Sequence, residues 1–187
     1  MGHALGFVSG VDFFDHYGYP SGPGRGALGC DLNDTSIFSA LDMFRYSAPG
    51  DLDFRTGGSP YFSVDGGQTA LFGNTFATGR FNGDGDQASH WTDATGRGGQ
   101  LGIMDPTFCF GQMGVLSGLD LAAFDAMGWN LSVDAMNYQN TSTAAIFAAL
   151  TVPEPSSWAL AFTALGLMGV ARRRVARKTT EPAQATH

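Results

Sequence analysis

The feature that most constrains the fold of this chain is an apolar segment followed by a cluster of basic residues. The parts of the chain on its two sides must lie in different surroundings. Residues 156–171 contain almost no polar side chain, and five of the ten basic residues follow at 172–178. As a helix the segment is ~24 Å long at ~1.5 Å per residue, a little shorter than the ~30 Å hydrocarbon core of a bilayer. We predict a short transmembrane helix with its basic end in the cytoplasm and the body across the inner membrane. The alternative is a buried core helix, which would show a polar stripe.

The first 150 residues are acidic and poor in charge. They contain fifteen Asp and five Arg but no Glu and no Lys, and the whole chain has 27 Gly and a net charge of −7. An acidic body argues against nucleic-acid binding, which needs a basic face. Aromatic residues make up 12% of the chain, whereas disordered chains lack them. The composition therefore indicates a loop-rich globular body.

Helical and strand-like patterns alternate along this body. Residues 4–8 fit the end of a helix with Gly6 in the following turn, and 18–29 fit a loop. Residues 35–46 predict a helix or a helix-to-strand junction capped near Asp34. Short strands are predicted at 61–65, 71–72 and 78–81.

The clearest element is an amphipathic helix over 119–129, which Ser117 can cap and Gly128 can end. The polar residues 130–152 read as a stalk. Cys30 and Cys109 fit either a disulfide of an exported protein or two separate buried thiols.

The tail resembles the PEP-CTERM sorting signal of Gram-negative bacteria. Its three parts stand in the order of that signal: Pro153, Glu154 and Pro155, then the apolar run, then Arg172, Arg173 and Arg174. The resemblance implies recognition by an exosortase, which would process the chain near the tripeptide. It also implies passage through the inner membrane and a final place at the cell surface or outside the cell.

The first residues resemble the end of a zinc-protease helix. That motif reads H-E-x-x-H, in which two His on one face bind zinc and the Glu is the general base. Met1 and Gly2 occupy the two variable positions here, and His3 occupies the place of the second His. The resemblance implies that the first His and the Glu stand directly before Met1, so that the chain is a fragment cut inside its active site.

Later motifs follow the order of the leishmanolysin-like metzincins. The third ligand of compact metzincins would fall on Ser9, a poor zinc ligand, so the resemblance assigns that role to His90 in Ser-His-Trp. Met104, in Ile-Met-Asp-Pro, resembles the Met-turn that forms an apolar floor beneath the zinc. The sequence leaves open whether Asp12 or His16 also lies near the metal.

This resemblance implies an α+β fold: an incomplete, loop-rich zincin (metzincin-like) catalytic domain, followed by a linker and one short C-terminal transmembrane helix. The predicted division is a partial domain at 1–130, a linker at 131–152, a sorting signal at 153–178 and a cytoplasmic tail at 179–187. In a full-length relative, Zn²⁺ would activate a water that hydrolyses a peptide or protein substrate. Because this chain has neither the first His nor the Glu, we predict that it does not hydrolyse peptides.

Two other functions fit the sequence. A non-catalytic surface or extracellular-matrix protein with the same tail would have the same Gly-rich, low-charge composition. The only support for a polysaccharide-binding module is a set of scattered aromatic residues. Separately, residues 82–86 resemble the start of a calcium loop, but Gln87 replaces the expected glycine and no Glu closes the loop. A polar turn is the simpler interpretation there.

Overall fold

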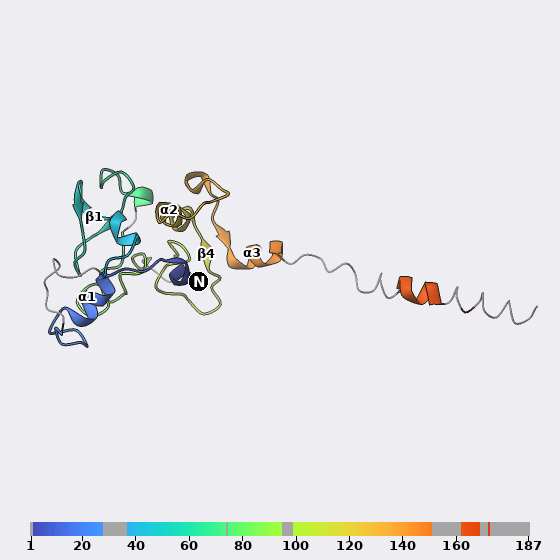
Figure 1. Cartoon of the computed structure of the whole chain (residues 1–187), viewed down its shortest axis with the longest axis horizontal. Helices are drawn as coiled ribbons and strands as arrows, with labels where there is room; N and C mark the ends of the chain where they lie inside the picture. Colours follow the sequence, from blue (N-terminus) through green and yellow to red (C-terminus); the bar gives the residue numbers. More distant parts are fainter. Residues whose placement is uncertain are drawn as a thin grey trace, which may run out of the picture. The chain divides into compact units, whose positions relative to one another are not determined.

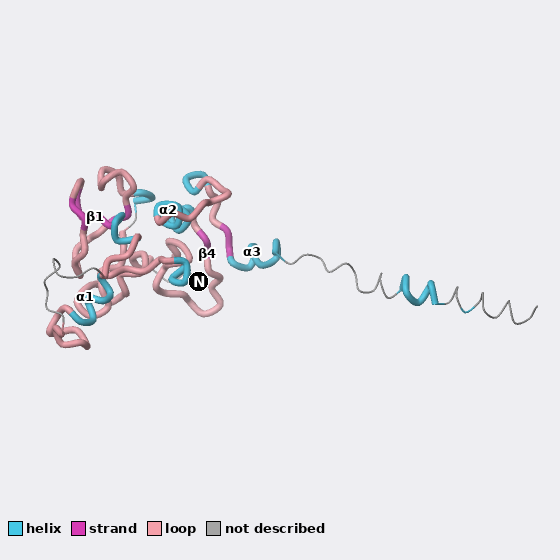
Figure 2. Tube along the Cα trace, in the orientation of Figure 1, coloured by secondary structure: helices cyan, strands magenta, loops and turns pink. Residues whose placement is uncertain are grey.

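Turns and loops connect short helices and very short strands in this protein (Figures 1 and 2). The computed structural model describes residues 2–27, 37–73, 75–94, 99–150, 162–168 and 172. The chain forms two compact units, Met1–Ile146 and Phe147–His187. Both helices and strands are present, which agrees with the mixed class predicted from sequence. The elements are η1 (Gly2–Leu5), α1 (Val11–Tyr17), η3 (Leu41–Phe44), β1 (Arg45–Ala48), β2 (Asp51–Leu52), β3 (Tyr61–Phe62), η4 (Leu71–Gly73), β4 (Val115–Leu116), α2 (Gly118–Ala126), η5 (Ala135–Asn137), β5 (Thr141–Ser142) and α3 (Thr143–Leu150).

The strands form two small antiparallel sheets. One has the order β2-β1-β3, and the other pairs β4 with β5. The junction predicted near residues 35–46 is present, because η3 runs directly into β1 at Arg45. Its predicted cap, Asp34, lies outside the described residues. The strand predicted from Tyr61 is also present, but it is only two residues long.

Helix α2 lies in the hydrophobic core. Ser117 caps it in a capping box with Asp120, and Gly128 takes φ +100° beyond its C-terminus, so the predicted signals at both ends are confirmed. The predicted amphipathic character is wrong, because residues 118–124 are all buried. The reason is that η5 and η3 both pack on this helix, which leaves it no broad polar face.

The core joins segments that are far apart in sequence. Trp91 is fully buried, and its ring contacts the rings of Phe7, Phe62 and Phe76 at centroid distances of 4.9, 5.8 and 4.8 Å. Its indole N–H donates to Asp120 on α2 at 2.9 Å. Residues near both ends of the body and from its middle therefore pack around one indole ring.

Buried carboxylates hold the loops together. Asp15 on α1 accepts backbone N–H groups from Phe81 and Asn82, each at 2.8 Å. Asp42 accepts from Gly10 at 2.8 Å and from the Ser9 hydroxyl at 2.5 Å. Loops have backbone N–H groups that no helix or sheet satisfies, and a carboxylate can accept several of them. The Asp-rich composition therefore serves the interior of the body as well as its surface.

Arg45 is the buried cation among these acids. Its Nη2 donates to the Ala77 carbonyl at 2.9 Å, and its guanidinium carbon lies 5.1 Å from the centre of the Phe76 ring. Burial lowers the pKa of Arg45 to about 10, against the opposing influence of Asp53, Asp42 and more distant carboxylates. The side chain thus stays charged at neutral pH and links β1 to the loop that follows Phe76.

Two of the predicted short strands are wrong. Residues 71–73 form the 3-10 helix η4, where Phe72 takes a left-handed φ of +56° that no strand contains. Residues 78–81 form a turn. There Gly79 takes φ +136°, and Asp15 binds the N–H groups that a strand would offer to its neighbour. Helix α1 itself is too short to give a clear period and has no predicted counterpart.

The chain beyond residue 130 is more ordered than the predicted stalk. Ala135 is buried in the core, β5 pairs with β4, and the first compact unit extends to Ile146. The residues predicted as a linker from 131 onward therefore contribute to the body for most of their length.

In the second unit, residues 162–168 are helical and exposed, and Arg172 is exposed. Within the described ranges, no helix has the length and apolar character needed to cross a membrane. The sorting-signal residues Pro153, Glu154 and Pro155 lie outside the described residues, as do Arg173 and Arg174 and most of the predicted transmembrane segment.

Candidate functional site

The rings of His3 and His90 lie side by side. Their centroids are 4.8 Å apart and their planes meet at 85°. His3 belongs to η1, and Gly6 ends this helix with φ +102°, a backbone conformation that glycine adopts easily. His90 lies in the turn directly before Trp91. Folding thus brings together two imidazoles that the sequence predicts to share a metal.

Both rings are oriented through the same nitrogen. The Nδ1 of His3 lies 2.7 Å from the Phe7 carbonyl, and the Nδ1 of His90 lies 3.3 Å from the Gln87 carbonyl. A carbonyl can only accept, so each Nδ1 donates its hydrogen, and in the neutral form of each ring Nε2 is the nitrogen with the lone pair. Histidine ligands of metals are commonly oriented by a hydrogen bond of this kind.

Met104 joins the two histidine segments. Its side chain is buried, and its Sδ would lie 2.1 Å from a methyl group placed on Gly2. Its carbonyl accepts the Trp91 N–H at 3.0 Å. The thioether therefore lies directly against the residue before His3, and the backbone of Met104 is bound to the residue after His90. The assignment of Met104 to a Met-turn stays a prediction.

Asp12 holds the segment that carries His90. Its carboxylate accepts the Ala88 N–H at 2.6 Å and the Ser89 N–H at 3.1 Å, together with the Ser89 hydroxyl. His16 instead packs on Tyr17 and Phe81, at centroid distances of 4.3 and 5.7 Å. Of the two residues left open by the sequence, Asp12 is thus the one bound beside His90. Sequence reasoning missed this role because 77 positions separate Asp12 from Ser89.

The environment of His90 favours a neutral ring. Burial lowers the pKa of His90, and the neighbouring His3 lowers it further, against weaker opposing effects of the Gln87 carbonyl, Asp12 and Asp86. A metal ligand must be neutral, so this shift makes the ring available for coordination at lower pH than an exposed histidine would be.

The pair lacks a further protein ligand within the part of the chain that the structure describes. In these residues no group of three or more His, Cys, Asp or Glu side chains is placed to hold a metal ion. Imidazole nitrogens are ligands that Zn²⁺ accepts, but catalytic zinc ordinarily has three protein ligands and one open position. The described residues therefore bring together two of the three protein ligands that such a site would need, and zinc binding stays a prediction.

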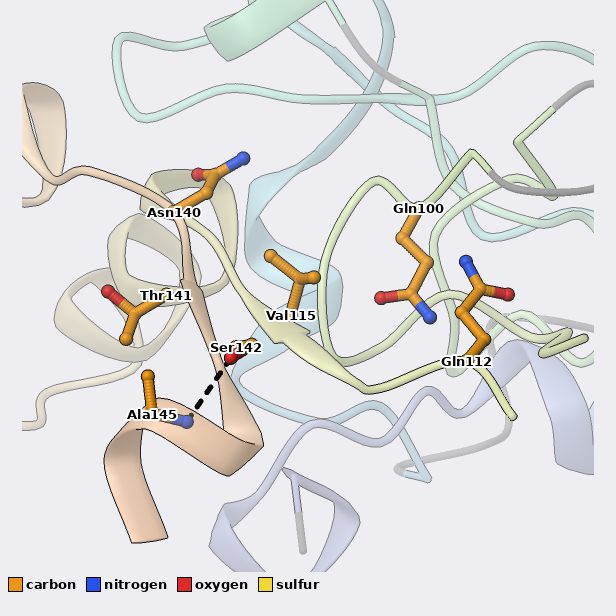
Figure 3. A pocket seen from close by; sticks show the side chains of 7 residues that line it. All are labelled: Gln100, Gln112, Val115, Asn140, Thr141, Ser142 and Ala145. Carbon is orange, nitrogen blue, oxygen red and sulfur yellow. Dashed lines mark hydrogen bonds between the residues drawn. The ribbon is translucent and has the colours of Figure 1, made fainter. Parts of the chain in front are cut away.

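A separate cavity of about 650 Å³ lies beside the β4–β5 sheet (Figure 3). All of its lining side chains are uncharged: Gln100, Gln112, Val115, Asn140, Thr141, Ser142 and Ala145. Figure 3 shows the Gln100 and Gln112 carboxamides pointing toward one another. The Gln100 oxygen and nitrogen are buried without a hydrogen-bond partner among the described residues. Since none of these groups titrates, the cavity can bind a polar molecule but offers no acid or base.

The other candidate features have structural roles. In the suggested calcium loop, Asp84 accepts the Thr78 N–H at 3.0 Å and the Asp86 N–H at 3.2 Å, while the Asn82 amide donates to Asp15 at 2.8 Å. These hydrogen bonds are those of a polar turn, and calcium binding there stays a prediction. Cys109 is an exposed free thiol, whereas Cys30 lies outside the described residues.

Comparison with known families identifies the tail. Residues 151–177 match the family described as the PEP-CTERM protein-sorting motif, which confirms the sorting signal predicted from the tripeptide, the apolar run and the basic cluster. The motif indicates export, processing by exosortase, and sorting to the cell surface or the extracellular space in Gram-negative bacteria. Searches with the chain against curated proteins and against solved structures gave no match.

Proposed function

We propose that this protein is an exported, exosortase-sorted relative of zinc metalloendopeptidases of the metzincin type, and that its body carries part of their zinc site. The observation that carries the proposal is the 4.8 Å approach of the His3 and His90 rings, with Met104 packed against Gly2, the residue before His3. These residues come from three distant segments, and the proposed fold family brings its ligands and Met-turn together in the same order.

In this proposal, His3 and His90 hold Zn²⁺ through Nε2. When bound in such a site, zinc lowers the pKa of a coordinated water toward ~7 and polarises a substrate carbonyl. The chain's own groups orient the ligands. The Phe7 and Gln87 carbonyls orient the rings, Asp12 holds the turn before His90, and the Met104 thioether packs against Gly2, the residue before His3.

Among the described residues, none is assigned to the proton transfer that peptide hydrolysis needs. No Glu occurs among residues 1–150. Asp12 on α1 is the carboxylate nearest to His3 in the sequence. It already accepts hydrogen bonds from Ala88 and Ser89. We therefore propose that this polypeptide binds Zn²⁺ weakly and does not cleave peptides. The Glu and the remaining His of the motif would stand at the two positions before Met1.

Zinc titration of the purified chain tests the metal site. We expect one Zn²⁺ per chain by calorimetry, and loss of that binding in His3→Ala and in His90→Ala. His16→Ala is the matched control, because His16 packs on Tyr17 and Phe81 rather than on the pair. Binding that survives in both His3→Ala and His90→Ala, or that is lost in His16→Ala, would contradict the proposed ligands.

A second experiment adds the two expected residues. A chain extended by His-Glu directly before Met1 should bind Zn²⁺ at least ~10-fold more tightly than one extended by Ala-Ala, because a third imidazole joins the site. Equal affinities would mean that the start of η1 does not continue the proposed motif.

The runner-up is a non-catalytic surface or extracellular-matrix protein with the same sorting tail. Its support is the Gly-rich, low-charge composition of the chain. The codons in frame before Met1 separate the two functions. Codons for His and Glu within a longer open frame support the peptidase, whereas an in-frame stop codon supports the non-catalytic protein.

A further inference from the structure

Helix α3 is apolar and largely exposed among the described residues. Its sequence is Thr-Ala-Ala-Ile-Phe-Ala-Ala-Leu, it contains no charged residue, and none of its residues is buried. Phe147 is 70% exposed and Leu150 is 74% exposed. A helix that is apolar on all sides normally lies inside a protein core or in a membrane. Its apolar surface therefore needs a partner that the described residues do not supply.

The start of α3 is fixed to the body. The Thr143 N–H donates to the Gly114 carbonyl at 2.7 Å, and the Ala145 N–H donates to the Ser142 hydroxyl at 3.2 Å. Ser142 belongs to β5, which pairs with β4. The helix thus begins as a direct continuation of a paired strand, at a defined place on the first compact unit, and is not an isolated segment.

The chain that follows α3 identifies the partner. The sorting motif begins at residue 151, one position after Leu150, and its apolar run begins at Ser156. The five intervening residues span at most ~18 Å at ~3.6 Å per residue. The end of α3 at Leu150 therefore lies within ~18 Å of the point where the apolar run enters a bilayer. This distance is about the thickness of a headgroup layer and part of the acyl region. No charged residue occurs between Asp134 and Glu154 to oppose contact with lipid.

We propose that α3 lies in the interface of the membrane that the sorting segment enters, with Phe147 and Leu150 among the acyl chains. The inference rests on the proposed insertion of that segment. Short apolar helices bind such interfaces in proportion to the apolar area that they bury. In this position α3 ends at the membrane directly before the first residue of the sorting motif.

The test places an environment-sensitive fluorophore on α3 in the full-length chain. In a background with Cys30→Ser and Cys109→Ser, a single cysteine is introduced by Phe147→Cys and labelled with nitrobenzoxadiazole. Met136→Cys is the matched control, because Met136 is also a large, exposed apolar residue at 58% and lies on η5. Each labelled chain is mixed with vesicles of phosphatidylethanolamine and phosphatidylglycerol and floated through a density gradient.

We expect both chains to float, and only the label at position 147 to shift its emission to the blue and to be quenched by lipids brominated in the acyl chain. Flotation with a label at 147 that behaves like the one at 136 would overturn the placement of α3 while leaving membrane insertion of the tail intact. Failure of both chains to float would overturn the insertion of the tail together with the inference.

Discussion

The body and the sorting tail use their polar residues in opposite ways. In the body, carboxylates such as Asp12, Asp15 and Asp120 are inside the fold, and each binds backbone N–H groups of a distant loop. In the tail, residues 156–171 are almost free of polar groups and the charges gather beyond them at 172–178. The body therefore depends on single side chains in fixed geometry, whereas the tail depends on the order and composition of its segments.

This difference has a direct consequence for mutation. Removing one buried carboxylate leaves several N–H groups without an acceptor, and each such group costs ~1–3 kcal/mol. Exchanging one apolar side chain for another in the tail changes neither its length nor its polarity. Substitutions of single residues should thus have large effects in the body and small ones in the apolar run.

The largest expected effect is that of Asp120→Ala. Asp120 accepts from the Trp91 indole, from the Ile103 N–H and from the Ser117 N–H at 2.9, 2.8 and 2.9 Å. We expect the free energy of unfolding to fall by ~3–5 kcal/mol, as for other broken buried networks. Urea denaturation measures it. Asp125→Ala on the same helix is the control, because Asp125 is exposed and should change stability by less than ~0.5 kcal/mol.

A second prediction concerns the Asp12 carboxylate. Asp12→Asn leaves one amide oxygen where two carboxylate oxygens bind Ala88 and Ser89, so the turn before His90 is held less firmly. We expect Zn²⁺ affinity to fall ~10–100-fold, the usual effect of losing an outer hydrogen bond to a ligand segment.

Asp15→Asn is the matched comparison, because Asp15 lies on the same helix but holds Phe81 and Asn82. That variant should lose stability with little change in Zn²⁺ affinity. Equal losses of affinity in the two variants would show that Asp12 acts on overall stability alone.

The third prediction concerns pH. Burial, and then His3, lower the pKa of His90 below its ordinary value of 6.5. The folded state then binds fewer protons than the unfolded chain, so the contribution of His90 to stability is lost as pH falls below 6.5 toward the folded pKa. We expect His90→Gln to flatten the decline of the free energy of unfolding between about pH 7 and about pH 5. If the free energy of unfolding of His90→Gln falls as steeply with pH as that of the parent chain, groups other than His90 cause the pH dependence.

The smallest effect is expected in the tail. Leu165→Ile and Met168→Leu keep the apolar character of the described helical segment 162–168. We expect the free energy of unfolding of the body to change by less than ~0.5 kcal/mol and the amount of protein at the cell surface to stay the same. A marked loss of surface protein in either variant would mean that individual apolar side chains of the tail are recognised specifically. The tail would then depend on single side chains, as the body does.

Sequence reasoning succeeded where the signal is local. The sorting tail is a linear pattern, and the family match confirmed it. The ends of α2 were predicted because Ser117 and Gly128 act on adjacent backbone groups. The junction before β1 was found for the same reason, since helical and strand-like residues meet there within a few positions.

It failed where distant groups override local preference. The strand predicted at 78–81 is a turn because Asp15, 66 residues away from Phe81, binds the backbone there. The burial of residues 118–124 of α2 depends on η5, which comes from a segment that composition alone marks as a stalk. The role of Asp12 and the neutral cavity beside β4 have no local signature, because their partners meet only after folding.

The most direct test of the proposed site is nitrogen NMR of the histidine rings during addition of Zn²⁺. One equivalent of Zn²⁺ should shift the Nε2 signals of His3 and His90 together, while each Nδ1 stays protonated through its bond to a backbone carbonyl. His16 should not respond. Movement of only one of the two paired rings, or a response of His16 instead, would contradict the central claim that His3 and His90 form a shared metal site.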